Sequence, residues 1–194
     1  MPVALRKNDD LFTYAHYATW PDEERWELID GIPFDMTPAP NRYHQDISVK
    51  ITSAIEQFLK GKKCKVYAAP FDVRFPEVNQ KDDEILTVVQ PDISVICDRS
   101  KLDTKGCKGA PDWIIEILSP GTSRKDRVIK FDTYERFGVK EYWLVSPDDK
   151  TVEVFILGEN GKYGRPEFYT EKKILSSSTL QGLSINLAEI FVED

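Results

Sequence analysis

Two short runs, QPDISVIC at residues 90–97 and WIIEILS at residues 113–119, decide the fold of this chain. Both are rich in apolar and β-branched residues, as buried strands are, and each run holds a single carboxylate. These carboxylates are Asp92 and Glu116. A charge inside an apolar strand costs free energy unless a partner compensates it, so each carboxylate requires a partner.

Helices and a further strand are predicted on either side of these runs. Residues 41–60 should form a long helix, because apolar side chains recur on one face and Asn41 is a suitable N-cap. A second helix is expected over about residues 124–137, closed by Gly138. EYWLVSP at residues 141–147 predicts the strand that follows it.

The order of helix, three strands, helix and strand predicts an α/β fold with a mixed central sheet and added N- and C-terminal strands. We expect one domain, since 194 residues can bury a sizeable core. Its core should span about residues 41–147, with an N-terminal helix and hairpin over 11–36 and C-terminal strands over 151–186. The three core strands are expected at residues 65–75, 85–97 and 113–119, the first two interrupted by proline.

Composition is typical of a globular protein, with 41% hydrophobic and 30% charged residues. No apolar run approaches the roughly 18–20 residues that cross a bilayer. Residues 1–10 lack the apolar region of a signal peptide, so we expect a cytoplasmic protein that does not enter a membrane. The three cysteines (Cys64, Cys97 and Cys107) form no CxxC pair, which predicts reduced thiols rather than a zinc site or a disulfide framework.

The net charge of −7 argues against a large nucleic-acid footprint that ignores base sequence. Residues 99–130 are an exception, with eight basic against four acidic residues. Such a stretch beside the two carboxylates would suit a phosphate backbone, although taken alone it is more typical of a solvated lysine-rich loop. The candidate contacts to nucleic acid are Lys101, Lys105, Lys108, Arg124, Lys125 and Arg127.

Asp92 and Glu116 can meet if their strands pair and both side chains point to one face, because strand side chains alternate. Carboxylate oxygens suit Mg²⁺ or Mn²⁺, and magnesium usually keeps water and substrate phosphate as its other ligands. The backbone carbonyl of Ile117 is a further candidate ligand. Two carboxylates with a nearby lysine would allow metal-assisted hydrolysis of a phosphodiester bond.

Lys130 is the candidate lysine, because it shares one helical face with Asp126 and Tyr134 at spacings of four residues. If that face meets the carboxylates, Lys130 would hold the attacking water or neutralise the scissile phosphate. Each residue also has a simpler explanation. Asp126 and Lys130 would form an ordinary helical ion pair, Tyr134 would serve packing, and Asp92 would complete a turn after Pro91.

Four motifs in this order, PDISV, EILSP, D-x3-K-x3-Y and GVKEYWLVSP, resemble the bacterial Uma-type putative restriction endonuclease family. That family belongs to the PD-(D/E)XK nuclease superfamily, and the resemblance covers about residues 26–157. It implies a core of helix, three strands, helix and strand, and divalent-metal cleavage of DNA. By position, Asp92 corresponds to the motif aspartate and Glu116 to the acidic residue that follows.

The chain departs from the superfamily pattern at Leu118, where a lysine is usual two residues after the glutamate. Lys130 is our candidate to replace that lysine. The departure therefore concerns the activation of water more than the metal site. The resemblance adds two further candidates, His44 and, more weakly, Glu27.

Three functions compete. A DNA endonuclease requires Asp92, Glu116 and Lys130 to converge on one site that is open to solvent. A catalytically silent module that binds nucleic acid or a protein partner predicts that Lys130 points away or that side chains fill the site. A carboxylate-pair hydrolase acting on sugars requires a cleft lined with aromatic residues. We also expect a homodimer, with residues 163–170 as its candidate interface, because cutting both strands of a duplex needs two sites.

Overall fold

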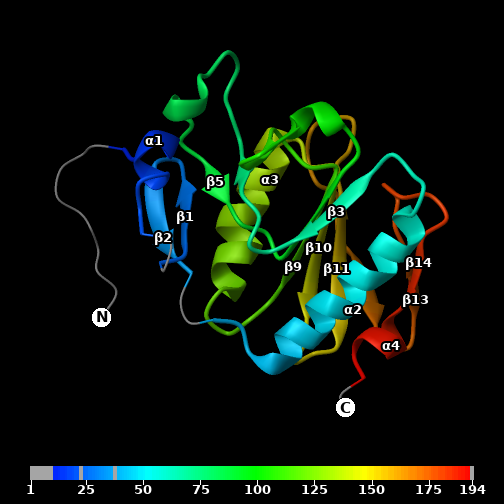
Figure 1. Cartoon of the computed structure of the whole chain (residues 1–194). Helices are drawn as coiled ribbons and strands as arrows, with labels where there is room; N and C mark the ends of the chain where they lie inside the picture. The colour runs from blue at the N-terminus through cyan, green and yellow to red at the C-terminus, as the bar shows by residue number, and fades with distance from the viewer. Residues whose placement is uncertain (1–10, 22–23, 37–38, 193–194) are drawn as a thin grey trace.

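A computed structural model describes residues 11–21, 24–36 and 39–192 of the chain (Figure 1). The prediction about a signal peptide concerned residues 1–10, which lie outside the described residues. Among the helices that are described, none is long and apolar enough to cross a membrane.

The main sheet has six strands among the described residues, in the order β12, β11, β10, β9, β6 and β3. Only β9 and β10 pair in parallel; the other neighbours are antiparallel. The predicted class, α/β with a mixed sheet, is therefore confirmed. The strands are β3 (Lys65–Ala68), β6 (Ile93–Ile96), β9 (Trp113–Ile117), β10 (Glu141–Ser146), β11 (Thr151–Ile156) and β12 (Glu167–Thr170).

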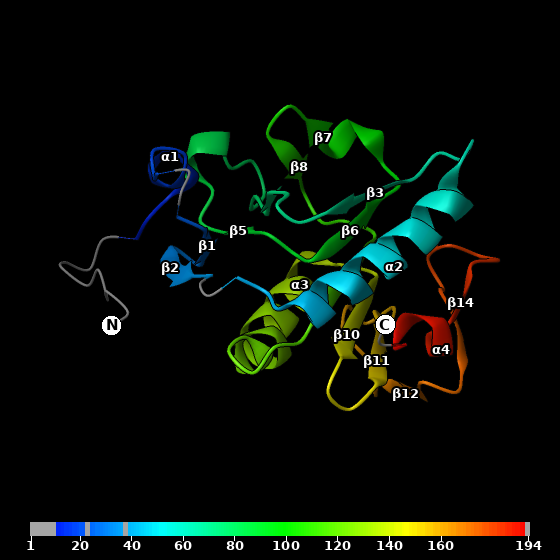
Figure 2. The ribbon, with the colours of Figure 1, turned by 60° about the horizontal axis from the view of Figure 1, so that its bottom comes forward.

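Two helices pack on opposite faces of this sheet (Figures 1 and 2). The predicted long helix is α2 (Arg42–Leu59), whose apolar face packs on one face of the strands with Ile115 of β9. The other face, with Ile114 of β9, packs against Tyr134 of α3 (Phe131–Phe137). The alternation of side chains in β9 thus supplies both layers of the core.

The second six-stranded sheet has the order β2, β1, β5, β4, β8 and β7. The predicted strands 65–75 and 85–97 are each divided between the two sheets, at Pro70 and at Pro91. A proline has no N–H for a ladder, so the chain leaves one sheet there and joins the other. The strands are β1 (Trp26–Ile29), β2 (Ile32–Asp35), β4 (Val73–Arg74), β5 (Val88–Val89), β7 (Leu102–Asp103) and β8 (Gly106–Lys108).

The remaining elements are short. The predicted hairpin turns at Asp30 and Gly31, which both have positive φ. The other elements are α1 (Tyr14–Tyr17), the 3-10 turns η1 (Asp82–Glu84) and η2 (Arg99–Lys101), the π-helix η3 (Lys125–Lys130), β13 (Ile174–Ser176), β14 (Ser184–Asn186) and α4 (Leu187–Ile190).

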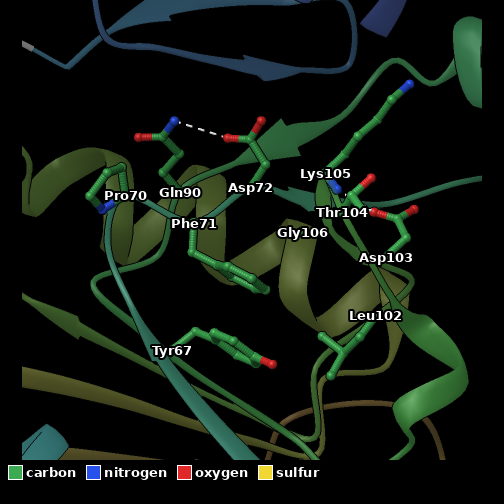
Figure 3. Close-up of a pocket in the computed structure, with 10 residues that line it drawn as sticks. All are labelled: Tyr67, Pro70, Phe71, Asp72, Gln90, Leu102, Asp103, Thr104, Lys105 and Gly106. Carbon is green, nitrogen blue, oxygen red and sulfur yellow. Dashed lines mark hydrogen bonds between the residues drawn. The ribbon is translucent and has the colours of Figure 1, made fainter.

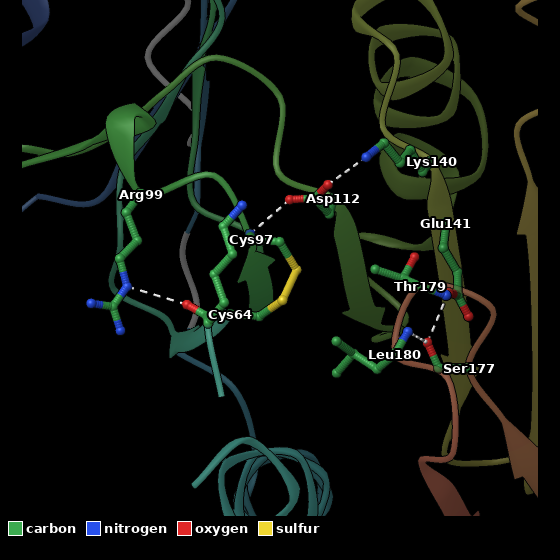
Figure 4. The surroundings of a disulfide bond; sticks show 10 residues. Cys64, Cys97, Arg99, Asp112, Lys140, Glu141, Ser177, Thr179 and Leu180 are labelled. Atoms are coloured by element: carbon green, nitrogen blue, oxygen red, sulfur yellow. Dashed lines mark hydrogen bonds and ion pairs between the residues drawn. A yellow bond between two sulfur atoms is a disulfide. The ribbon is translucent and has the colours of Figure 1, made fainter. Parts of the chain in front are cut away.

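A disulfide joins Cys64 and Cys97, and the prediction of reduced thiols is wrong for this pair (Figure 4). Cys64 precedes β3 and Cys97 follows β6, and these strands pair antiparallel with Lys65 opposite Ile96. The two cysteines are therefore cross-strand neighbours, which their separation of 33 residues in the sequence did not reveal. Cys107 is buried and free.

Reduction of this disulfide should lower the free energy of unfolding by about 3–4 kcal/mol, because the open chain gains loop entropy in the unfolded state. Urea unfolding with and without dithiothreitol measures the difference. The Cys64→Ser/Cys97→Ser double variant is the control, since reductant should not affect it. Identical unfolding of the wild type in both buffers would contradict the prediction.

Glu141 anchors the C-terminal segment from inside the main sheet. Its side chain is fully buried and accepts hydrogen bonds from Ser177 Oγ (2.9 Å) and Thr179 N (2.7 Å). Ser178 N and Oγ and the Trp143 indole also donate to it. These donors compensate the buried carboxylate without a cation.

The Glu141→Gln variant should lose about 2–4 kcal/mol of stability, because the amide cannot accept all of these hydrogen bonds. Thermal or urea unfolding measures the loss, and Glu159→Gln, at an exposed loop position, is the matched control. Equal stability of the two variants would show that the buried carboxylate does not anchor this segment.

Candidate active site

The two carboxylates predicted from the sequence face each other across paired strands. Asp92 lies next to Ile93, which pairs with Ile115 in the antiparallel partner β9, so Asp92 and Glu116 are adjacent. Each strand's backbone also donates to the other strand's carboxylate. Ile117 N donates to Asp92 Oδ2 at 2.8 Å, and Asp92 N donates to Glu116 Oε2 at 3.4 Å.

Lys130 points toward Glu116 of this pair and toward Asp126. Its Nζ lies 2.8 Å from Glu116 Oε1 and 3.7 Å from Asp126 Oδ1, and its side chain is only 2% exposed. Tyr134, one helical turn later, donates its hydroxyl to the same Glu116 oxygen at 2.6 Å. The structure therefore brings together the three residues that the helical spacing grouped, and turns them toward Glu116.

Glu27 lies at the centre of the cluster, although the family resemblance indicates it only weakly. It comes from β1 in the second sheet, is fully buried and contacts Lys130 Nζ at 2.7 Å and Lys125 Nζ at 2.7 Å. Gln90 N also donates to it at 3.0 Å. The signal was present in the sequence, because Glu27 in WELI is a lone charge in an apolar strand, as Glu116 is in WIIEI.

The π-helix explains how Lys125 and Lys130 reach one carboxylate. Residues five apart on an α-helix point about 140° away from each other, at 3.6 residues per turn. A π-helix closes its hydrogen bonds over five residues, so such a pair lies on nearly one face. Lys125, predicted only as a nucleic-acid contact, is in consequence part of the charged cluster.

His44 contacts two of the predicted metal ligands. His44 lies in the first turn of α2. The N-cap residue of that helix, Asn41, accepts a hydrogen bond from His44 N at 2.9 Å. Its Nε2 lies 3.3 Å from Asp92 Oδ2, and its ring also bonds the Ile117 backbone. Burial opposes the charged ring, but Asp92 and the Ile117 backbone outweigh it and raise the pKa of His44.

The protonation of the cluster reflects an excess of carboxylates. Burial, opposed by Lys130 and reinforced by the neighbouring carboxylates, raises the pKa of Glu116 to about 8. Burial also raises the pKa of Asp126. For Glu27 the two lysines outweigh burial and lower the pKa, and for Lys130 the carboxylates outweigh burial and raise it. Three carboxylates, those of Glu27, Glu116 and Asp126, thus share two lysines, while Asp92 pairs with His44.

The cluster opens into a cavity of about 500 Å³. Asp92 is 20% exposed there, whereas Glu116 and Lys130 behind it are 4% and 2% exposed, so solvent reaches the cluster at Asp92. Phe34 is the one aromatic residue among its described lining residues, which does not support the sugar-hydrolase interpretation. Besides the acids and lysines above, the lining includes Arg25, Met36, Asn41, Gln90, Ser119 and Thr122.

The donors at this site fit magnesium or manganese better than zinc. No group of three or more His, Cys, Asp or Glu side chains among the described residues is arranged to hold a metal. Two carboxylates and a backbone carbonyl are nonetheless an adequate set for Mg²⁺, which keeps several waters. Within the described part of the chain, Asp92 Oδ1 receives no hydrogen bond and is available as a ligand.

The other predicted nucleic-acid contacts lie outside this cavity. Lys105 and Lys108 are within 3.6 Å and 3.4 Å of Asp82, and Lys101 Nζ donates to the Ala110 carbonyl. Arg127 pairs with Glu153 on β11, and Arg124 is exposed. Of the six basic candidates, only Lys125 lines the cavity.

Comparisons with known proteins give a consistent picture. The model of the family Uma2, described as "Putative restriction endonuclease", matches residues 14–188. The uncharacterized protein slr1290 of Synechocystis sp. (strain PCC 6803) is 26% identical over 150 residues, 76% of this chain and 75% of that protein. A crystal structure of a putative nuclease belonging to DUF820 from Anabaena variabilis has a TM-score of 0.73 at 23% identity, covering 93% of this chain and 97% of that one, so the two share a fold.

Proposed function

This chain belongs to the Uma2 family, and we therefore propose that it is a metal-dependent endonuclease that hydrolyses phosphodiester bonds in DNA. The family description supports nuclease function in general. The observation that carries the finer proposal is the convergence of Asp92, Glu116 and Lys130 at a cavity that solvent can enter. A silent module would place Lys130 elsewhere or fill this cavity.

In this proposal Asp92, Glu116 and the Ile117 carbonyl would hold Mg²⁺ or Mn²⁺, and His44 would orient Asp92. The bound ion would polarise a phosphoryl oxygen and lower the pKa of a coordinated water. Lys130 holds Glu116 through Oε1 and leaves Oε2 directed toward Asp92. Lys125, with its side chain 13% exposed at the cavity wall, neutralises charge on the phosphate.

Cleavage of supercoiled plasmid tests the proposal directly. We expect nicking with Mg²⁺ or Mn²⁺ and none with EDTA, because the two-carboxylate site requires a divalent ion. Linear duplex, single-stranded and branched DNA should be assayed beside the plasmid. Absence of cleavage of every substrate with both metals would favour the silent module, which Leu118 and the net charge of −7 would also suit.

We further propose that residues 1–194 act as one domain in the cytoplasm. A homodimer would form through β12, an edge strand of the main sheet that bears the exposed Phe168. Sedimentation of the wild type should give twice the chain mass, and Phe168→Glu should give the monomer. A monomeric wild type at micromolar concentration would reject the dimer.

A further inference from the structure

A second cavity of about 400 Å³ lies beside the candidate active site and contains a stacked aromatic pair (Figure 3). The rings of Tyr67 and Phe71 are 4.3 Å apart between centroids and nearly parallel, at 5°. Both side chains are half-buried and line the cavity rather than being enclosed in the core. A flat aromatic surface of this kind offers a stacking partner to another planar ring.

The same cavity has a fixed polar edge. Gln90 Nε2 donates to Asp72 Oδ1 at 2.9 Å, and the Tyr17 hydroxyl donates to the same oxygen at 3.0 Å. Arg25 in turn donates to Gln90 Oε1 at 2.9 Å, so the amide is held from both ends. Within the described chain, Asp72 Oδ2 receives no hydrogen bond, which leaves an acceptor for an N–H group.

Gln90 connects this cavity to the active site. Its side chain lines both cavities, and its backbone N–H donates to Glu27 Oε1. Ala69 N donates to the Asp92 carbonyl at 2.9 Å, so the turn carrying Phe71 begins beside Asp92. Gln90 is the one described residue that lines both cavities, and it places them side by side.

The chemistry of the two cavities fits neighbouring parts of one nucleic-acid strand. Lys105 also lines the aromatic cavity, where its Nζ lies 3.6 Å from Asp82 and would exchange that carboxylate for a phosphate. In a regular duplex the faces of the bases are covered by their neighbours, so only an unpaired or displaced base can stack on a side chain. The net charge of −7 also disfavours a long duplex footprint.

We propose that Phe71 and Tyr67 bind an unpaired base next to the phosphate in the active site, so that the substrate is single-stranded or locally opened DNA. This inference rests on the proposed nuclease function for its substrate. Asp72 and Gln90 contact the edge of the base, and Lys105 contacts the adjoining phosphate.

Binding without cleavage tests the proposal. Fluorescence anisotropy in EDTA should show that short oligothymidylate binds on the order of tenfold more tightly than an abasic oligonucleotide of equal length and charge. Phe71→Leu, which keeps apolar volume but removes the aromatic ring, should abolish most of this difference, and Phe71→Trp should retain it. Phe58→Leu, at a half-buried aromatic on α2 that lines neither cavity, is the matched control and should bind as the wild type does.

The outcomes separate the subsite from the nuclease. Equal binding of thymidylate and abasic strands, or a base preference that survives Phe71→Leu and Tyr67→Leu together, would overturn the subsite even if plasmid cleavage is found. Base-dependent binding that these variants remove would support the subsite even if no DNA is cleaved. Unfolding midpoints of all variants must match that of the wild type, and Phe71→Trp supports the assignment should the leucine variants unfold.

Discussion

Asp92→Asn should lower metal-dependent DNA cleavage by at least about a thousandfold, corresponding to about 4 kcal/mol of transition-state stabilisation. The amide keeps the size of the side chain and can still accept the hydrogen bond from Ile117 N. It removes the negative charge that a divalent ion needs from its first ligand. Plasmid cleavage rates at saturating Mg²⁺ and Mn²⁺ measure the effect, with far-ultraviolet circular dichroism to verify the fold.

The matched control for this variant is Asp132→Asn, at an exposed position on α3 outside the active-site cavity. It should cleave as fast as the wild type. Glu116→Gln should behave like Asp92→Asn, because both remove one of the two carboxylates. Cleavage that persists in both variants would mean that the activity comes from another site or from a contaminant.

Lys130→Met should abolish cleavage and also lower the free energy of unfolding by about 3–5 kcal/mol, since it removes one partner of a buried ion cluster. Methionine retains the length of the lysine stem without its charge. Glu27, Glu116 and Asp126 would then face one another without the cation that separates them. Lys125→Met should cost less stability, because that side chain is partly exposed and its one ion pair among the described residues is with Glu27.

A double-mutant cycle distinguishes the structural effect of Lys130 from its effect on activity. Adding Glu116→Gln to Lys130→Met removes one of the unpaired carboxylates and should restore part of the lost stability. It should not restore cleavage, because Glu116 is a proposed ligand. Urea unfolding and plasmid cleavage on the four proteins complete the cycle. Lys130→Met that cleaves at the wild-type rate would exclude Lys130 from the site.

Local patterns in the sequence account for much of the candidate site. Asp92 and Glu116 stood out because each interrupts an apolar strand, and Lys130 because helical spacing aligns it with Asp126. Both patterns, a lone charge in an apolar strand and a spacing of four residues on a helix, involve only residues that are close in the sequence. In the structure these residues do lie together. Their roles in catalysis remain predictions that the variants above test.

The remaining features depend on contacts between distant segments. Glu27 joins the site only because a second sheet packs near the main one, and β4 and β5 belong to that sheet because the chain changes sheets at Pro70 and Pro91. Lys125 reaches Glu27 through a π-helix, which helical periodicity does not predict. Cys64 and Cys97 pair because β3 and β6 are neighbours, a relation that an odd cysteine count concealed.

The attachment of Glu27 to Lys125 and Lys130 has a consequence for protein synthesis. During synthesis Glu27 emerges from the ribosome early, and Lys130 emerges about a hundred residues later. Strand β10, which neighbours the strand of Glu116, emerges after Lys130. A nascent chain that ends before Lys125 therefore holds Glu27 and Glu116 without the two lysines that pair with the acidic cluster. Under the proposed function, the chain can cleave DNA only after synthesis has passed β10.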